Sequence, residues 1–366
     1  MTIAFYAPLK SPDHPVPSGD RQMARLLVAA LAVAGYDPQP ASSLRGYLPK
    51  GDCGLEALQS AARAEVDRLL DAYRSGILRT PDIWFTYHPY YKSPDLIGPH
   101  IADALGVPYV TAEASHANKR ASGPWARAHQ CNQKALERAD LNFYFTQTDR
   151  EGLVSLVHSE GKVCHLPPFL DVQGIPERTV WETGADRTVR LLTVAMMRQD
   201  VKLDSYRMLA EALRGMKDLS WSLDIVGDGD ARPQVNAAFA PLPQERLTWH
   251  GRLTPEALAP LYAACDLYVW PGFGEAYGMA FLEAQAAGLA VVAQDTGGIA
   301  SVVRHRETGL LTQLNDVGAY RKGLSELIEN QGQRAQFGRA ALTFVRSERS
   351  IETASARLKE ALDRLT

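Results

Sequence analysis

The window from Trp270 to Glu283 contains the residues best suited to chemistry in this chain. Three of its glycines precede a predicted helix that begins near Met279. A glycine-rich turn that leads into a helix presents free backbone N–H groups and the positive end of the helix dipole, and both favour phosphate. Glu275 lies before this helix and Glu283 within it. Because a carboxylate can accept paired hydrogen bonds from vicinal hydroxyls, the window predicts a site for a sugar joined through phosphates to a nucleoside.

A departing diphosphate needs positive charge to stabilise it. Arg198 and Lys202 follow the predicted strand Val189–Val194 and are the two candidates for this role. We expect Lys202 to be the main cation and Arg198 the second.

Strand-like and helix-like segments alternate along the chain and must position these residues. The first apolar run, Ile3–Ala7, is followed by a loop that contains glycine and then by a helical pattern from Asp20. Nucleotide-type α/β domains begin in this order. Pro167 and Pro168 fit neither a helix interior nor a central strand, and the same alternation restarts after them.

We therefore expect an α/β protein with two doubly wound, Rossmann-like domains, residues 1–168 and 169–350, facing a central cleft. The last segment, 351–366, is predicted to be a terminal helix that could pack back on the amino-terminal domain. The other strands are expected at 83–86, 108–111, 141–145, 222–226, 247–250, 267–270 and 290–293. Helices are expected at 54–75, 95–106, 124–139, 203–214, 254–264, 279–287, 317–328 and 332–346.

Composition excludes several classes of protein. The 366 residues are 46% hydrophobic and 22% charged, with a net charge of −3, so no general basic field indicates a nucleic-acid partner. The four cysteines are scattered, which argues against a zinc site or a disulfide framework and favours a reducing cytoplasm. The chain starts like a strand and its longest apolar run, 26–34, is about half of a membrane-spanning helix. A cytoplasmic location is expected.

At Glu275, Tyr277, Gly278 and Glu283 the chain resembles the retaining glycosyltransferases of family 4. Their signature is two glutamates separated by seven residues, with an aromatic residue and a glycine between them, and their fold is the two-domain GT-B fold. The resemblance implies that Glu275 holds hydroxyls of the donor sugar and that Glu283 holds the ribose hydroxyls. The backbone amides after Gly278, starting at Met279, would face the diphosphate.

Other segments of the carboxyl half resemble the family in order and spacing. Ile225–Gly229 is similar to the strand and turn that close near the base, which makes Gly227 a donor-binding candidate. The remaining similar segments are His250–Leu253, Leu261–Asp266, Asp295–Ile299 and Glu307–Leu311.

The chain departs from the family pattern at two places. Met196 stands nearer than Arg198 to the position where the family has its arginine, so the resemblance supports Lys202 more than Arg198. Many relatives have a glutamate after the Gly-Gly loop, where this chain has Ala300 and Ser301.

In the amino half, the resemblance is carried by two loops. Gly19 lies in the loop after the first strand, where relatives bring the backbone close to the ligands. Glu113 and His116 follow the strand 108–111, where family members place an active-site histidine. The loop continues through Lys119, which could contact an acceptor.

The resulting hypothesis is a metal-independent, cofactor-independent glycosyl transfer with retention, from a nucleotide diphosphate sugar to an unidentified acceptor. A nucleotide-sugar epimerase and a non-catalytic nucleotide-sugar binder are the alternatives. Asp228 and Asp230 are interpreted as turn residues rather than metal ligands. His88 and His165 are interpreted as packed or capping residues. The helix 54–75 is expected to cover the sheet, and peripheral membrane contact is possible but not indicated.

Overall fold

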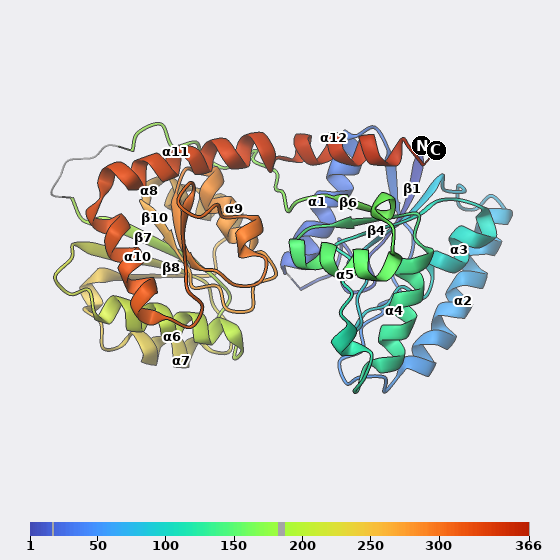
Figure 1. The fold of residues 1–366 in the computed structure, drawn as a ribbon, viewed down its shortest axis with the longest axis horizontal. Coiled ribbons are helices and arrows are strands. Elements are labelled where there is room, and N and C mark those ends of the chain that lie inside the picture. Colours follow the sequence, from blue (N-terminus) through green and yellow to red (C-terminus); the bar gives the residue numbers. More distant parts are fainter. Residues whose placement is uncertain (17, 182–186, 366) are drawn as a thin grey trace. The chain divides into compact units, whose positions relative to one another are not determined.

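The computed structural model describes residues 1–16, 18–181 and 187–365, and the chain divides into two compact units (Figure 1). The amino-terminal unit consists of Met1–Pro167 and Ile351–Thr366, and the carboxyl-terminal unit of Pro168–Ser350. Each unit contains a parallel six-stranded sheet with helices around it.

The sheet of the amino-terminal unit has the strand order β2-β1-β3-β4-β5-β6. Every residue of β1 and β3 is buried, as expected for a parallel sheet covered on both faces. The strands are β1 Thr2–Tyr6, β2 Asp37–Pro40, β3 Ile83–Tyr87, β4 Tyr109–Ala112, β5 Leu141–Tyr144 and β6 Val163–His165. The α-helices are α1 Gly19–Val33, α2 Leu55–Arg74, α3 Gly98–Leu105, α4 Ala126–Arg138 and α5 Gln147–Val157.

The last helix, α12 (Ile351–Leu362), packs on α1 of the amino-terminal unit (Figure 1). Its inward face, including Leu358 and Leu362, is fully buried. At its end, the Tyr36 hydroxyl donates a 2.6 Å hydrogen bond to Asp363 Oδ1.

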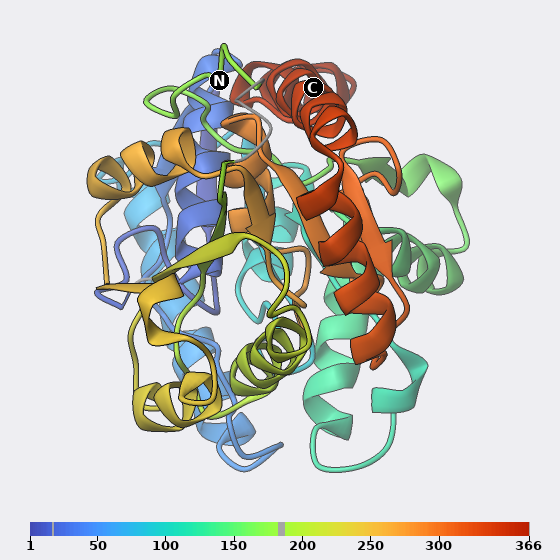
Figure 2. The ribbon, with the colours of Figure 1, turned by 90° about the vertical axis from the view of Figure 1, so that its left-hand side faces the viewer.

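The sheet of the carboxyl-terminal unit has the order β12-β11-β10-β7-β8-β9, and helices lie on both of its sides (Figure 2). The strands are β7 Val189–Val194, β8 Trp221–Val226, β9 Leu247–Gly251, β10 Leu267–Val269, β11 Ala290–Gln294 and β12 Gly309–Thr312. The α-helices are α6 Val201–Arg214, α7 Arg232–Phe239, α8 Pro255–Ala264, α9 Met279–Ala286, α10 Val317–Glu329 and α11 Gln331–Glu348.

Each sheet has a point at which the strand order reverses. In the amino-terminal unit β1 lies between β2 and β3, and in the carboxyl-terminal unit β7 lies between β8 and β10. Loops on the two sides of such a point leave the sheet in opposite directions and open a crevice at the carboxyl ends of the strands. Ligands of doubly wound proteins bind there, so the topology gives two places in which to look for a site.

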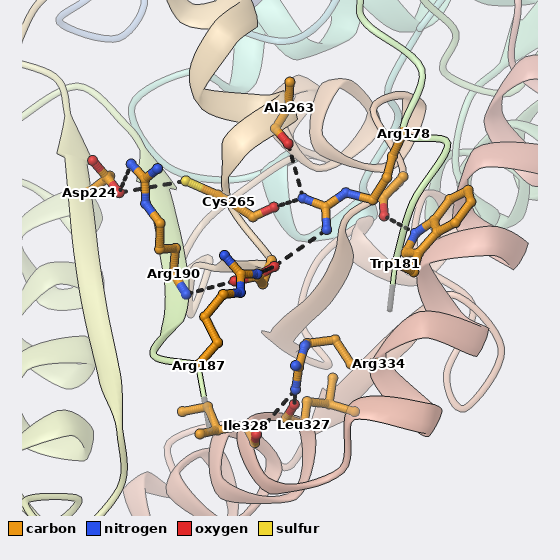
Figure 3. A network of polar contacts seen from close by, with 12 residues as sticks. Arg178, Trp181, Arg187, Arg190, Asp224, Ala263, Cys265, Leu327, Ile328 and Arg334 are labelled. Atoms are coloured by element: carbon orange, nitrogen blue, oxygen red, sulfur yellow. Dashed lines mark hydrogen bonds and ion pairs between the residues drawn. The ribbon is translucent and has the colours of Figure 1, made fainter. Parts of the chain in front are cut away.

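A buried carboxylate joins the segment before β7 to the connection between α8 and β10 (Figure 3). Asp266 forms ion pairs with Arg187 and, at 3.4 Å, with Arg178. Its second oxygen accepts from the backbone N–H of Arg190 at 2.9 Å. Nearby, the Trp181 indole N–H donates to the Gly288 carbonyl oxygen at 3.0 Å, so the residues before the undescribed segment 182–186 are held to the unit.

Three strands and two helices were not expected from the sequence, namely β2, β6, β12, α5 and α7. The nine expected strands are confirmed with ends shifted by at most one residue. The expected helices are confirmed with ends shifted by up to four residues. Among the helices described, none is both long and apolar enough to cross a bilayer.

Candidate active site

The first cluster lies in the carboxyl-terminal unit, where the order of its sheet reverses. Lys202 is the second residue of α6, directly after the loop that leaves β7. The side chain of Asp200 caps this helix by accepting from the Lys202 N–H at 2.8 Å. Glu275 lies in the loop that leaves the neighbouring strand, β10. The two candidate residues thus come from the two sides of the reversal point.

Lys202 and Glu275 form an ion pair, and both side chains are mostly buried, with 18% and 15% of their surface exposed. The same carboxylate oxygen, Glu275 Oε1, accepts from the Trp270 indole N–H at 3.0 Å. The Lys202 ammonium lies 5.9 Å from the centre of the Trp270 ring. No role for Trp270 was predicted from the sequence. The structure makes it the residue that orients Glu275.

The loop between β10 and α9 follows a path that glycine permits. Gly278, just before α9, has a φ of +79°. At Gly297, with a φ of +55°, an added Cβ would lie 2.3 Å from the carbonyl oxygen of Glu275. The loop containing Gly297 therefore packs directly on the backbone of Glu275, which larger residues would push away.

The start of α9 at Met279 agrees with the sequence prediction. Within the described part of the chain, no side-chain hydrogen bond caps this helix at Gly278, so its first N–H groups lack a side-chain acceptor at the cap position. Tyr277 and Met279 are buried and hold the turn in place. An uncapped helix start beside a lysine is suited to an anionic group.

Glu283 lies within α9 and is partly exposed. The hydroxyl of Tyr262, a buried residue of α8, donates to Glu283 Oε2 at 3.0 Å. Tyr262 fixes one carboxylate oxygen and was not assigned a role from the sequence.

Arg198 and Gly227 are the other two candidates in this unit. Arg198 is exposed, and its guanidinium contacts Met196 Sδ at 3.3 Å; within the described residues it forms no ion pair with Glu275. Gly227 has a φ of +143°, and an added Cβ would lie 1.8 Å from the Ala195 carbonyl oxygen. Gly227 thus allows the loops after β7 and β8 to pack together, and its role at a donor stays a prediction.

The second cluster lies at the carboxyl ends of β1, β3 and β4 in the amino-terminal unit. His88 Nδ1 lies 3.6 Å from Glu113 Oε1 and 3.7 Å from Asp20 Oδ1. Tyr87 donates from its hydroxyl to Glu113 Oε2 at 2.7 Å. His88 therefore stands between two carboxylates at the reversal point of this sheet.

Glu113 is the most perturbed acid of this cluster. Burial raises its pKa to about 7, against the opposing effects of His88 and Tyr87. Burial also raises the pKa of Asp149, which helps to raise that of Glu113. His88 and Glu113 both have left-handed backbone conformations, with φ values of +58° and +52°. Such conformations are uncommon for residues other than glycine and occur often at functional sites.

His116 lies in a separate part of the same loop. Its ring stacks on that of His129, with centroids 4.9 Å apart, and its Nε2 lies 3.0 Å from Asn118 Oδ1. Burial and the neighbouring His116 lower the pKa of His129. Lys119 is exposed, as is Gly19, the first residue of α1.

Some of the sequence-predicted residues thus come together in two groups, one in each unit. Lys202, Glu275 and the turn before α9 come together in the carboxyl-terminal unit, where they can hold an anion beside a hydroxyl-binding carboxylate. Glu113 comes together with His88 and Asp20 in the amino-terminal unit, where it can hold or exchange a proton near neutral pH. Asp228 accepts from the Gly229 N–H at 2.9 Å, as a turn residue does.

Comparisons with known proteins bear on the family and the fold of the chain. Residues 188–330 match the family described as Glycosyl transferases group 1. The chain is 28% identical to the D-inositol 3-phosphate glycosyltransferase of Mycolicibacterium gilvum, over 75% of this chain and 66% of that protein. It is 26% identical to the enzyme of that name from Corynebacterium efficiens, over 79% of this chain and 74% of that one. The first of these matches leaves about a third of the relative uncovered.

Solved structures show the fold. Sucrose-phosphate synthase from Thermosynechococcus elongatus superposes with a TM-score of 0.74 at 19% identity, covering 100% of this chain and 98% of the other. HepE from Anabaena, solved in complex with UDP, superposes with a TM-score of 0.73 at 14% identity, covering 100% of both chains. The resemblance to family 4 glycosyltransferases and the expected α/β fold of GT-B type are confirmed.

Proposed function

Because residues 188–330 match the group 1 glycosyltransferases and the whole chain has the GT-B fold, we propose that this protein transfers a sugar from a nucleoside diphosphate to an acceptor hydroxyl. The observation that carries the proposal is the joining of Lys202, Glu275 and Trp270 beside the uncapped start of α9. This arrangement supplies a cation, a hydroxyl acceptor and backbone N–H donors at the carboxyl ends of neighbouring strands in one unit.

Each residue of this cluster has a distinct task in the proposal. The N–H groups that start at Met279, together with Lys202, stabilise the charge that develops on the departing diphosphate. Glu275 accepts from hydroxyls of the transferred sugar, and the Trp270 N–H keeps its carboxylate in place. Glu283, oriented by Tyr262, accepts from the ribose hydroxyls.

We further propose that the sugar is transferred with retention and without a metal or other cofactor. Lys202 and the helix start provide the positive charge that a metal supplies in other transferases. In this course the acceptor attacks from the side on which the diphosphate leaves, and its proton passes to a departing phosphate oxygen. Arg198 is a second cation in this proposal, and His116, Glu113 and Lys119 act on the acceptor side.

The test is turnover with a panel of nucleotide sugars, in which UDP sugars come first because the similar HepE structure contains UDP. Lys202→Gln and Glu275→Gln should each lower the turnover number by about 10²–10³-fold, the usual cost of removing one preorganised charge-stabilising group. Near-normal turnover in both variants would reject the assigned roles.

The product distinguishes the proposal from its alternatives. NMR of the product should give the same anomeric configuration as the donor, in reactions that contain a chelator. Conversion of the donor sugar with no acceptor present would indicate an epimerase. Tight nucleotide binding with no transfer to any acceptor would indicate a non-catalytic binder.

A further inference from the structure

His116 and His129 form a stacked pair of histidines in the amino-terminal unit. His116 lies in the loop after β4, and His129 lies near the start of α4. Their ring centres are 4.9 Å apart, and the ring planes are inclined by 25°. Both residues are buried, with 8% and 2% of their surface exposed. The acceptor-side role proposed for His116 does not explain why a second buried imidazole faces it.

Each of the two rings has a nitrogen with no protein partner. Within the described residues, His116 Nδ1 and His129 Nε2 are buried and form no hydrogen bond. The same holds for Asn132 Oδ1, which lies three residues after His129 and therefore on the same face of α4. Buried polar atoms without a partner are costly. Three of them on neighbouring side chains indicate a ligand that supplies what the chain does not.

The other atoms of these side chains have partners that leave lone pairs on the unpaired ones. His116 Nε2 lies 3.0 Å from Asn118 Oδ1, which can only accept, so Nε2 carries the ring proton and Nδ1 has the lone pair. The Asn132 side-chain N–H donates to the Ser115 carbonyl oxygen at 3.1 Å, which fixes the amide and leaves Oδ1 as an acceptor. Outer partners of this kind orient the ligands of metal ions in proteins.

The spacing of the two rings is that of imidazoles bound to one ion. Histidine nitrogens lie about 2.0–2.1 Å from zinc, and two imidazoles at neighbouring corners of its tetrahedron have centres roughly 5 Å apart. The observed 4.9 Å is close to this value. The backbone of His116 is also held in place, because an added Cβ at Gly152 of α5 would lie 2.3 Å from the His116 carbonyl oxygen. The fold therefore brings the ligands together by itself.

We propose that His116 Nδ1, His129 Nε2 and Asn132 Oδ1 bind a divalent transition-metal ion, zinc in the first place. Imidazole nitrogen suits zinc, copper and nickel, whereas magnesium and calcium prefer oxygen ligands. Among the described residues, no group of three or more histidines, cysteines or carboxylates is placed to hold a metal ion. Asn132 is therefore the third ligand, and water is the fourth. Because this ligand set is neutral, it binds zinc more weakly than a set of cysteine thiolates does.

The ion fastens the loop after β4 to α4, since its ligands come from both. It stabilises this loop and not the departing diphosphate, whose charge the proposed transfer assigns to Lys202 and the start of α9. The inference thus goes beyond the proposed function and does not depend on it. Turnover in a chelator tests the proposed function, whereas zinc binding tests this site.

The test is calorimetric titration of the full chain, without an added histidine tag, with zinc chloride and magnesium chloride. Zinc should bind at one ion per chain and raise the melting temperature, and magnesium should do neither. His129→Phe keeps an aromatic ring against His116 and removes one ligand. It should weaken zinc binding by about 100-fold or more, since loss of an outer partner alone costs about 10–100-fold. The matched control is His100→Phe, which replaces an exposed histidine of α3 and should leave zinc binding unchanged.

Asn118 offers two variants with opposite expected effects, and its exposed position makes both compatible with the fold. Asn118→Ala removes the outer partner of His116 and should weaken zinc binding by about 10–100-fold. Asn118→Asp places a carboxylate on His116 Nε2, which makes the ligating nitrogen more basic, and should tighten zinc binding. These two variants test the inference even if His129→Phe does not fold.

Three results would overturn the inference. Equal zinc affinity in the wild type and in His129→Phe would show that the ion does not bind at this pair. Loss of zinc binding in His100→Phe would assign the ion to a surface histidine. No zinc binding at all, with unchanged melting temperature, would assign the unpaired atoms to buried water.

Discussion

Glu113, the buried acid beside His88, leads to a prediction about how the stability of the protein depends on pH. Burial raises the pKa of Glu113 from an ordinary value of 4.5 to about 7. The folded protein therefore holds this proton more tightly than the unfolded chain does. Between these two pH values, the contribution of Glu113 to the free energy of unfolding falls as the pH rises. A rise of this size corresponds to about 3 kcal/mol, at 1.36 kcal/mol for each pH unit.

Glu113→Gln removes the titrating group and keeps a side chain of the same shape. We compare the free energies of unfolding of the variant and the wild type. Between pH 4.5 and pH 8, the difference between them should change by about 3 kcal/mol in favour of the variant. His88, Tyr87, Asp20 and Asp149 face or influence the same carboxyl group, and they remain in both proteins.

The assay is urea unfolding followed by circular dichroism at half-unit steps of pH. Glu151→Gln is the control, because this glutamate is exposed on α5 and should leave the pH dependence parallel to that of the wild type. Parallel curves for the wild type and Glu113→Gln would refute the argument, since they would mean that Glu113 titrates alike in the folded and unfolded states.

Two further variants test the carboxyl-terminal unit. Tyr262→Phe removes the hydroxyl that orients Glu283 and should raise the KM for the donor about fivefold, the effect of one lost hydrogen bond, while kcat changes less than KM; an equal fall in kcat with unchanged KM would contradict this role. Gly297→Ala should destabilise the fold by at least about 1–2 kcal/mol and lower turnover, because its Cβ would lie 2.3 Å from the Glu275 carbonyl oxygen. The control, Gly161→Ala, has its nearest atom at 3.8 Å and should unfold at the wild-type urea concentration; matching behaviour of the two alanine variants would refute the packing argument.

The regular parts of the fold were predictable because they obey local rules. The strand β11 begins with the continuous apolar run Ala290–Ala293, which is how a strand buried on both faces is recognised. The start of α9 at Met279 was predictable because glycines precede it and an apolar segment follows.

The missed strand β2 shows where local rules fail. Its sequence, Asp-Pro-Gln-Pro, contains two prolines, which normally argue against a strand. It lies at the edge of the sheet, where Asp37 donates to the Met1 carbonyl oxygen and Ala41 to that of Phe5, both at 2.9 Å. The prolines alternate with these donors, so no hydrogen bond to β1 is lost. This compatibility of the prolines with a strand can be seen only from the register of β2 against β1, which depends on the whole sheet.

The candidate site was predictable only in part, for a similar reason. Lys202 and Glu275 were identified from their segments, but their contact depends on β7 and β10 being neighbours although two strands intervene in sequence. Trp270 and Tyr262 act on the two glutamates through single hydrogen bonds across loops. His88 lies beside Asp20, which is 68 positions away in the sequence. Such pairings follow from topology rather than from composition or spacing.

The most direct test of the central claim is an experimental structure with the nucleoside diphosphate of a donor bound. The diphosphate oxygens should lie about 2.7–3.2 Å from the Lys202 ammonium and from backbone N–H groups in the first turn of α9. The ribose hydroxyls should lie on Glu283. A nucleotide bound with its diphosphate away from both Lys202 and α9 would contradict the account.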